Sequence, residues 1–286
     1  MSSEGRSTPG DDQASSVDTE VRRFAESILD AADVVAVEEP LEIQLVLPEE
    51  PGEFSLSVTM RTPGDDEDLA AGFLFTEGII DRASQLDGVT SCAPNQSGYR
   101  NVVKATLSRD VEIDRERLTR HVYTTSSCGV CGKTSIDAVR VASRYDLTLG
   151  KPRVSREVVE SIPRALRASQ AAFDQTGGVH AAALFDLEGK LVDIREDVGR
   201  HNAVDKVIGA AFRRDQVPLS ELVLMVSGRA GFELVQKSVR AGVPIMAAVS
   251  APSSLAVELA RESGMTLLAF VREGRFNCYA NPERIE

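Results

Sequence analysis

The sequence predicts an α/β protein: a three-layer α/β/α sandwich preceded by a smaller mixed α+β domain. The first observation is that residues 179–271 alternate apolar runs with amphipathic stretches in the order ββαβαβαβ. Buried strands joined by single helices imply parallel neighbours with right-handed crossovers. The second is that residues 41–61 alternate apolar and polar positions, as half-buried strands do. The third is the length of 286 residues, enough for one large domain or two modest ones.

Composition divides the chain into four segments. Residues 1–36 are acidic and begin without apolar periodicity, so we expect a disordered tail. A small α+β domain is expected over 37–122, a loop over 123–134 and the α/β domain over 135–286. No function is assigned to the tail.

The small domain is predicted to contain four strands and one helix. The segment 48–53, rich in Pro and Glu, joins the first two strands, and a turn at 62–66 opens the helix. The strands are expected at 41–47, 54–61, 89–93 and 99–107, and the helix at 68–80.

The α/β domain begins with two amphipathic stretches, 135–145 and 155–173, and Pro163 requires a break or a kink in the second. A turn at 186–189 then joins two strands as a hairpin, so the first strand of the sheet runs antiparallel to the others. The strands are expected at 179–185, 190–196, 222–227, 244–250 and 266–271, and the helices between them at 201–212, 232–242 and 253–264.

Composition excludes several classes of protein. A hydrophobic fraction of 42% excludes disorder throughout, and four cysteines are too few for a disulfide scaffold of this length. No run approaches the roughly 18 apolar residues of a membrane span, and the N-terminus lacks the features of a signal peptide. We therefore expect a cytoplasmic protein with no membrane partner.

The net charge of −12 argues against nucleic acid as a partner. The charge is unevenly distributed, however. Residues 1–100 contain 21 acidic and 6 basic side chains, whereas the remaining 186 contain 23 acidic and 26 basic ones. The second part of the chain can therefore accommodate an anionic ligand.

Four loops follow the predicted strands of the α/β domain and are rich in Gly, Ser and Arg. Each alone is typical of an ordinary helix cap or turn. If the strands are parallel, the loops share the carboxyl edge, where open α/β sheets bind ligands and where helix N-termini favour anions. The set predicts an anionic, nucleotide-like ligand. The loops cover 197–202, 227–231, 250–254 and 272–275, and contribute Arg200, Arg229, Arg272 and Arg275.

Cys128 and Cys131 form a CxxC pair in a Ser- and Gly-rich loop. Such a pair tends to have a low thiol pKa, which suits a nucleophile or a sulfur carrier. A zinc site would need two more ligands at metal spacing, and we predict no metal. A thioredoxin-type redox pair should directly follow a strand, and an inert structural pair remains a further alternative.

The histidines give weaker indications. A zinc deaminase is rejected because His180 is not followed by Glu at the catalytic position and the CxxC precedes it. His180 lies in an apolar strand and is interpreted as structural. His201 opens a predicted helix at the ligand edge, where it either caps the helix or contributes to the site.

These residues resemble the FdhD/NarQ family, the formate dehydrogenase accessory sulfurtransferases, from about Val37 to Ile285. Each motif alone is weak, but their order over about 250 residues is specific to that family. The matching segments are 62–66, 72–74, 77–80, 127–132, 176–180, 195–206, 227–229 and 270–275.

The resemblance implies a function. Members accept sulfur from a cysteine desulfurase as a persulfide and pass it to the molybdenum of the bis(molybdopterin guanine dinucleotide) cofactor for formate dehydrogenase. Cys128 would carry the persulfide and Cys131 would assist or share it. A second domain similar to the cytidine deaminase fold and a homodimer are also implied. A non-catalytic molybdenum-cofactor carrier is the alternative, ahead of a zinc or thiol redox protein. The implied cofactor-binding residues are Phe270, Val271, Arg272, Glu273, Gly274 and Arg275.

Overall fold

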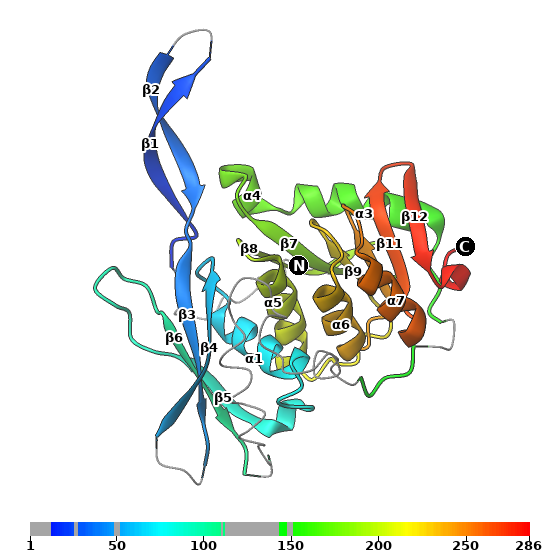
Figure 1. Cartoon of the computed structure of the whole chain (residues 1–286), viewed down its shortest axis with the longest axis horizontal. Helices are drawn as coiled ribbons and strands as arrows, with labels where there is room; N and C mark the ends of the chain where they lie inside the picture. Colours follow the sequence, from blue (N-terminus) through cyan, green and yellow to red (C-terminus); the bar gives the residue numbers. More distant parts are fainter. Residues whose placement is uncertain (1–12, 26–27, 49–51, 110, 112–142, 148–150) are drawn as a thin grey trace, which may run out of the picture.

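The computed structural model describes residues 13–25, 28–48, 52–109, 111, 143–147 and 151–286. Within these ranges the chain forms a six-stranded sheet, a four-stranded sheet and a two-stranded hairpin (Figure 1). The predicted α/β class is confirmed. The expected division at the 123–134 loop lies outside the described residues, and so do residues 135–142 of the first expected helix.

The six-stranded sheet has the order β12-β11-β10-β9-β7-β8. Strands β9, β10 and β11 are parallel, and β7 runs antiparallel to both of its neighbours, as the sequence predicted. An unpredicted edge strand, β12, returns antiparallel to β11. The strands are β7 (His180–Phe185), β8 (Leu191–Asp197), β9 (Val223–Val226), β10 (Ile245–Ala248), β11 (Thr266–Arg272) and β12 (Arg275–Ala280).

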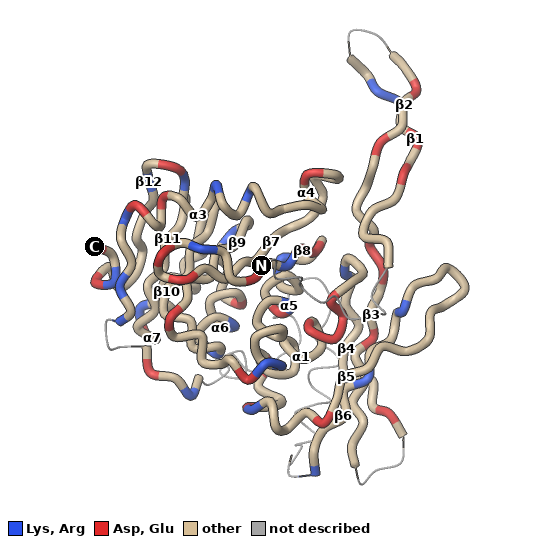
Figure 2. Tube along the Cα trace, turned by 180° about the vertical axis from the view of Figure 1, so that it is seen from behind, with Lys and Arg blue, Asp and Glu red and all other residues tan. Residues whose placement is uncertain are grey.

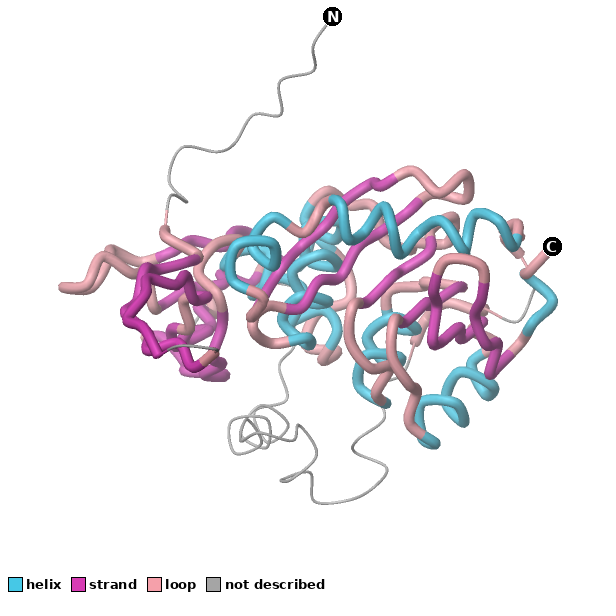
Figure 3. The backbone as a smooth tube through the Cα atoms, turned by 90° about the horizontal axis from the view of Figure 1, so that it is seen from above, coloured by secondary structure: helices cyan, strands magenta, loops and turns pink. Residues whose placement is uncertain are grey.

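Helices cover both faces of this sheet, which gives the predicted three layers (Figure 3). One face packs against α3 (Arg156–Ala168), whose buried residues Val159, Ile162 and Leu166 share a core with alternate sheet residues such as Phe185. A second, larger core lies on the other face. The helices there are α5 (Arg200–Arg213), α6 (Phe232–Arg240) and α7 (Ser254–Ser263). The likeness to the cytidine deaminase fold stays a prediction.

Helix α3 is not broken at Pro163, where the sequence predicted a break or a kink. Helix α3 passes through Pro163 and ends at Ala168, and the short helix α4 (Ala171–Thr176) follows after Ser169 and Gln170. Pro163 removes only one helical hydrogen bond, whereas the buried stripe of α3 holds the helix against the sheet. The break therefore falls at the end of that stripe.

The four-stranded sheet has the order β4-β3-β6-β5, with β3 parallel to β6 and the other pairs antiparallel. Its elements are β3 (Glu39–Val46), β4 (Glu53–Arg61), β5 (Leu86–Ser91), β6 (Val102–Leu107), α1 (Asp66–Thr76) and the single turn η1 (Ala83–Gln85). A second such turn, η3 (Pro282–Arg284), closes the chain. The α+β prediction for this part is confirmed in its strands and its helix.

Helices α1 and α5 join the two parts through a close crossing at two glycines. A Cβ atom at Gly72 would lie 1.9 Å from the Asp205 carbonyl oxygen, and one at Gly209 would lie 1.9 Å from the Asp68 carbonyl oxygen. Only glycine at these two positions permits so close an approach of the helices. The residues around the crossing belong to one hydrophobic core that extends from one sheet to the other.

The tail predicted over residues 1–36 is wrong for its second half. Strands β1 (Ser16–Phe24) and β2 (Ile28–Ala36) form an antiparallel hairpin that projects beyond both sheets (Figure 1). Its valines favour strand geometry, and Arg22 pairs with Asp30 directly opposite at 2.8 Å (charged residues are coloured in Figure 2). The net negative charge of residues 1–36 favoured a disordered tail, and the pairing of opposite charges between the two strands was therefore not predicted. Residues 1–12 lie outside the described part.

Candidate functional site

Each of the six strands of the larger sheet has one end at the same edge, where the amino end of β12 lies beside the carboxyl end of β11. The carboxyl ends of β8, β9, β10 and β11 meet there with the amino end of β7. This confirms that the four predicted loops share an edge. Two of them are tied together, since Ser250 N–H donates to the Gly228 carbonyl at 3.2 Å and Ala230 N–H to the Ala251 carbonyl at 3.1 Å.

The β11–β12 connection is a tight turn rather than the expected loop. Arg272 and Arg275 are opposite partners in the two strands, and Gly274 between them has φ 76°. Like charges directly opposite one another on a sheet are destabilising. Phe270 has φ 53°, a left-handed conformation that is unusual for an aromatic residue. Unfavourable charge and backbone geometry thus coincide at this turn, as they often do at binding sites.

A cavity of about 350 Å³ lies against this turn and is called the turn cavity. It is lined by Phe270, Arg272, Arg275, Phe276 and Asn277. Three of the predicted cofactor-binding residues therefore line it. Of the others, Val271 is buried in the α3 core, while Glu273 and Gly274 occupy the exposed turn itself.

A larger cavity of about 570 Å³ lies on the α3 side of the same edge and is called the α4 cavity. Apolar walls come from α3, α4 and the ends of β10 and β11, and Arg272 reaches this cavity as well as the first. Ser227 and Arg272 come from the predicted loops, whereas Arg167, Gln170 and His180 were missed by the sequence reasoning because they lie outside those loops. The polar residues that line it are Arg167, Gln170, His180, Ser227 and Arg272.

His180 lines this cavity, and its interpretation as a structural residue stays a prediction. Burial, with the nearby Arg200 charge, lowers the pKa of His180 below its ordinary value. The neutral imidazole can donate and accept hydrogen bonds. Gly177 and Gly178, which precede His180, also line the cavity. This glycine pair is the sequence feature from which a binding site at the start of β7 could have been predicted.

Two serines of the edge have structural partners. Ser227 Oγ accepts the Ala181 N–H at 2.9 Å, which leaves its own hydroxyl hydrogen to donate. Ser253 Oγ accepts the Ala256 N–H at 3.3 Å and so caps α7. The ordinary-cap interpretation is therefore correct for Ser253, whereas Ser227 lines the α4 cavity.

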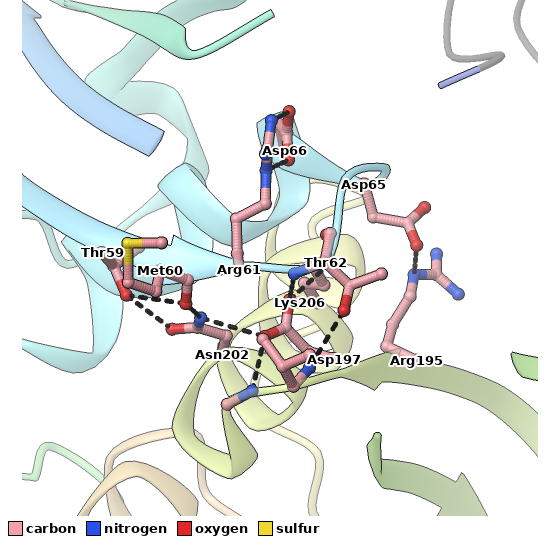
Figure 4. Close-up of polar contacts among 12 residues, drawn as sticks. Thr59, Met60, Arg61, Thr62, Asp65, Asp66, Arg195, Asp197, Asn202 and Lys206 are labelled. Atoms are coloured by element: carbon pink, nitrogen blue, oxygen red, sulfur yellow. Dashed lines mark hydrogen bonds and ion pairs between the residues drawn. The ribbon is translucent and has the colours of Figure 1, made fainter. Parts of the chain in front are cut away.

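The first predicted ligand loop, 197–202, instead joins the two sheets (Figure 4). Asp197 is fully buried, lies 2.8 Å from Lys206 Nζ and accepts the Thr62 N–H at 3.2 Å. Asn202 donates to the Met60 carbonyl at 2.8 Å. Thr62 and Met60 lie more than 130 residues from Asp197 and Asn202 in the sequence, so local patterns could not reveal these contacts.

His201 also faces this junction. Its Nε2 lies 3.4 Å from a Glu233 carboxylate oxygen, and it does not cap α5, whose N-cap is Gly199. Burial, with Arg200 and Lys237 nearby, lowers the pKa of His201 to about 3. The side chain is thus a neutral hydrogen-bonding group at the junction.

Lys237, a buried cation on α6, contacts α1 and α5 near the carboxyl end of α1. Lys237 Nζ lies 2.9 Å from Asp205, 3.0 Å from Glu77 and 2.9 Å from the Thr76 hydroxyl. Burial alone would lower the pKa of Lys237, but Asp205 and Glu77 raise it above its ordinary value. Lys237 therefore stays charged and ties α6 to α1.

Cys128 and Cys131 lie outside the described residues, so the structure does not test the predicted sulfur site. Among the described residues no cluster of three His, Cys, Asp or Glu side chains could hold a metal ion. No helix in the described part is long and apolar enough to cross a membrane.

Comparison with known proteins identifies the family. Residues 36–286 match the FdhD/NarQ family. The chain belongs to the FdhD/NarQ family.

Among relatives, the sulfur carrier protein FdhD of Streptomyces avermitilis is 53% identical over 257 residues, covering 88% of this chain and 89% of the relative. That of Mycobacterium tuberculosis is 46% identical over 267 residues, covering 91% and 95%. The crystal structure of a putative formate dehydrogenase accessory protein from Desulfotalea psychrophila superposes with a TM-score of 0.72 at 27% identity, covering 96% of this chain and all of that one. The FdhD/NarQ resemblance drawn from the sequence is thereby confirmed.

Proposed function

We propose that this chain is a sulfurtransferase for the molybdenum bis(molybdopterin guanine dinucleotide) cofactor of formate dehydrogenase. Cys128 or Cys131 accepts the outer sulfur of a cysteine desulfurase persulfide: one S–S bond breaks on the donor and another forms on the acceptor thiolate. The second cysteine thiolate then attacks the inner sulfur of the persulfide, so that a Cys128–Cys131 disulfide forms and the outer sulfur leaves as sulfide to the cofactor, which is the substrate. The transfer takes place in the cytoplasm. Relatives named sulfur carrier proteins and the CxxC pair support this proposal.

The observation that carries the cofactor half of the proposal is the arginine pair at the β11–β12 turn. Arg272 and Arg275 oppose one another beside the turn cavity, where a diphosphate would relieve their repulsion and receive planar donor groups. Phe270 supplies an exposed aromatic face next to them. We assign the cofactor's phosphates to this turn.

The sulfur step is tested by mass spectrometry of the intact protein after incubation with a cysteine desulfurase and cysteine. A persulfide adds one sulfur atom, about 32 Da, to Cys128 or Cys131. Cys278→Ala is the matched control, because Cys278 is exposed yet burial of its thiol raises its pKa. Labelling should persist in this control and vanish in the Cys128→Ala, Cys131→Ala double variant.

A non-catalytic cofactor carrier is the second candidate, favoured by the extent of the two cavities. Absence of the adduct on both cysteines, together with cofactor binding, would establish that alternative. Full formate dehydrogenase activity in cells that carry the double cysteine variant would contradict the transfer role.

We propose a second copy of the chain as the partner that covers the β1–β2 hairpin. Two-stranded hairpins are marginal on their own in water, and this one exposes Phe24, Ile28 and Leu29 near its end. Sedimentation equilibrium should show a dimer that Leu29→Asp dissociates. A monomer at all concentrations would contradict this part.

A further inference from the structure

A further cavity, of about 290 Å³, lies at the opposite edge of the six-stranded sheet and is called the β9 cavity. It lies between the carboxyl end of β7, the amino ends of β8 and β9, the end of α5 and the loop 214–222. Pockets for small ligands have volumes of about 300–1,000 Å³. The β9 cavity is at the lower limit of that range and is better matched to one large side chain of a partner protein.

The walls of the β9 cavity suit an apolar side chain. Leu184 and Leu219 are 2% and 3% exposed, whereas Val192 on the edge strand β8 is 53% exposed. Interface residues that carry much of the binding energy are large side chains that fill such pockets. The apolar lining residues are Leu184, Val192, Ala211, Pro218, Leu219 and Leu222.

The main chain of β8 excludes a partner that binds by adding a strand. The Ile194 N–H donates to the Asp193 carboxylate at 2.9 Å, and the Ile194 carbonyl accepts from the Arg195 guanidinium at 2.9 Å. Strand addition requires free main-chain groups at the edge of a sheet. The partner must therefore insert a side chain into the cavity instead.

The charges of the neighbouring loop indicate the character of that partner. Asp215 and Glu221 are exposed, and neither carboxylate has a hydrogen-bond or ion-pair partner among the described residues. Arg213 and Arg214, which precede them, are both paired with acidic residues. The unpaired charge beside the cavity is thus negative, so a basic surface complements it.

The β9 cavity also lies beside the described residues that follow the CxxC pair in the sequence. A Cβ atom at Gly242 would lie 2.6 Å from the Pro218 side chain and 3.0 Å from the Tyr145 ring. Tyr145 therefore packs next to a wall of the cavity, and it follows Cys131 by 14 residues. The opposite edge of the sheet, with the β11–β12 turn, stays accessible when a protein binds here.

We propose that the β9 cavity and the loop 214–222 form the docking surface for the protein that donates sulfur. That protein presents a large apolar side chain within a basic surface. This inference rests on the proposed function, because the donor is then the cysteine desulfurase that loads Cys128 or Cys131.

Calorimetric titration of the full chain with the cysteine desulfurase tests the surface. Val192→Glu places a carboxylate at the apolar wall and should weaken binding about tenfold or more. Val58→Glu is the matched control, because Val58 is also a strand valine, 48% exposed, but lies in β4 of the other sheet. The control should bind the desulfurase like the unmodified chain.

Glu221→Lys tests the charge separately from the apolar wall. It reverses an exposed carboxylate that has no partner among the described residues, so the fold should tolerate it. Affinity for the desulfurase should fall several-fold at low salt, and the difference from the unmodified chain should shrink as salt screens the charges.

Loading with a small donor separates docking from sulfur chemistry. Inorganic polysulfide transfers its terminal sulfur to the cysteine thiolate and leaves one sulfur shorter, so no protein contact is needed. Persulfide should form at equal rates in Val192→Glu and Val58→Glu with polysulfide. With limiting desulfurase, formation should be slower in Val192→Glu only, and excess desulfurase should restore the rate.

Two results would overturn the inference: no binding of the desulfurase to the unmodified chain, or equal affinity of Val192→Glu and Val58→Glu for it. Absence of persulfide with both donors would instead contradict the proposed function, whereas the calorimetric comparison still decides where the desulfurase binds.

Discussion

Replacement of Gly209 by alanine should destabilise the protein, although the same change in most helices is stabilising. Glycine in a helix interior costs about 1 kcal/mol relative to alanine. Here the added Cβ would lie 1.9 Å from the Asp68 carbonyl oxygen and 2.6 Å from the Gly72 nitrogen, both main-chain atoms. Rotamer changes cannot relieve either contact, so α5 must move away from α1.

The size of the effect follows from that displacement. Ordinary contact requires about 3.4 Å, so the helices must separate by roughly 1.5 Å, which disturbs a core shared by both sheets. Overpacking of this kind costs about 3 kcal/mol. After the propensity gain, a net loss of about 2 kcal/mol remains, which lowers the melting temperature by roughly 4–8 °C for a chain of this size.

Thermal melts of the Gly209→Ala and Gly88→Ala variants provide the test. Gly88 lies in β5, and a Cβ there would meet no atom within 4 Å. The control should melt within about 2 °C of the unmodified chain. An unchanged or raised melting temperature for Gly209→Ala would refute the close crossing of α1 and α5.

Two further predictions concern the junction. Asp197→Asn leaves the buried Lys206 ammonium without its anion and should reduce the free energy of unfolding by about 3 kcal/mol in urea titrations. The control variant Asp30→Asn breaks an exposed pair with Arg22 and should reduce the free energy of unfolding by less than about 1 kcal/mol. Equal losses in the two variants would contradict the burial of the Asp197–Lys206 pair. The folded-state pKa of His201, about 3, lies below its ordinary value of 6.5, so the unfolded state binds its proton first, and stability should fall as the pH is lowered through 6.5 toward 3. His201→Gln should remove part of that acid sensitivity in pH-dependent urea midpoints, and an identical pH profile would show that His201 is not buried neutral.

The arrangement of the α/β domain was predictable because its signals are local. Gly264 has φ 75° at the end of α7 and Gly242 has φ 72° just after α6, as glycine-terminated helices require. Strand direction followed from connection type, which placed the four loops at one edge. The motif 270–275 was also found, with Arg272 and Arg275 at the cavity.

The features of the site that the sequence did not reveal share one cause, which is contact between segments far apart in the sequence. His180 and Gln170 look like ordinary strand and helix-end residues until the fold brings α3, α4 and three strand ends around one space. Asp197 looked like a ligand-edge residue until Thr62 and Lys206 enclosed it. The β1–β2 hairpin is a local pairing and was missed for another reason: β1 contains two acidic and two basic residues, and β2 is rich in Ala and Asp.

The sequence by itself determined the α/β class, the order of helices and strands over residues 39–107 and 180–272, and the family, because periodicity, glycine positions and ordered motifs are properties of neighbouring residues. Tertiary structure alone decided which charged residues are buried at the α1–α5 junction and which face the edge. It also decided that Arg272 reaches two cavities and that Gln170 lines one of them. Burial and cavities are made by segments that meet only after folding, so no local pattern encodes them.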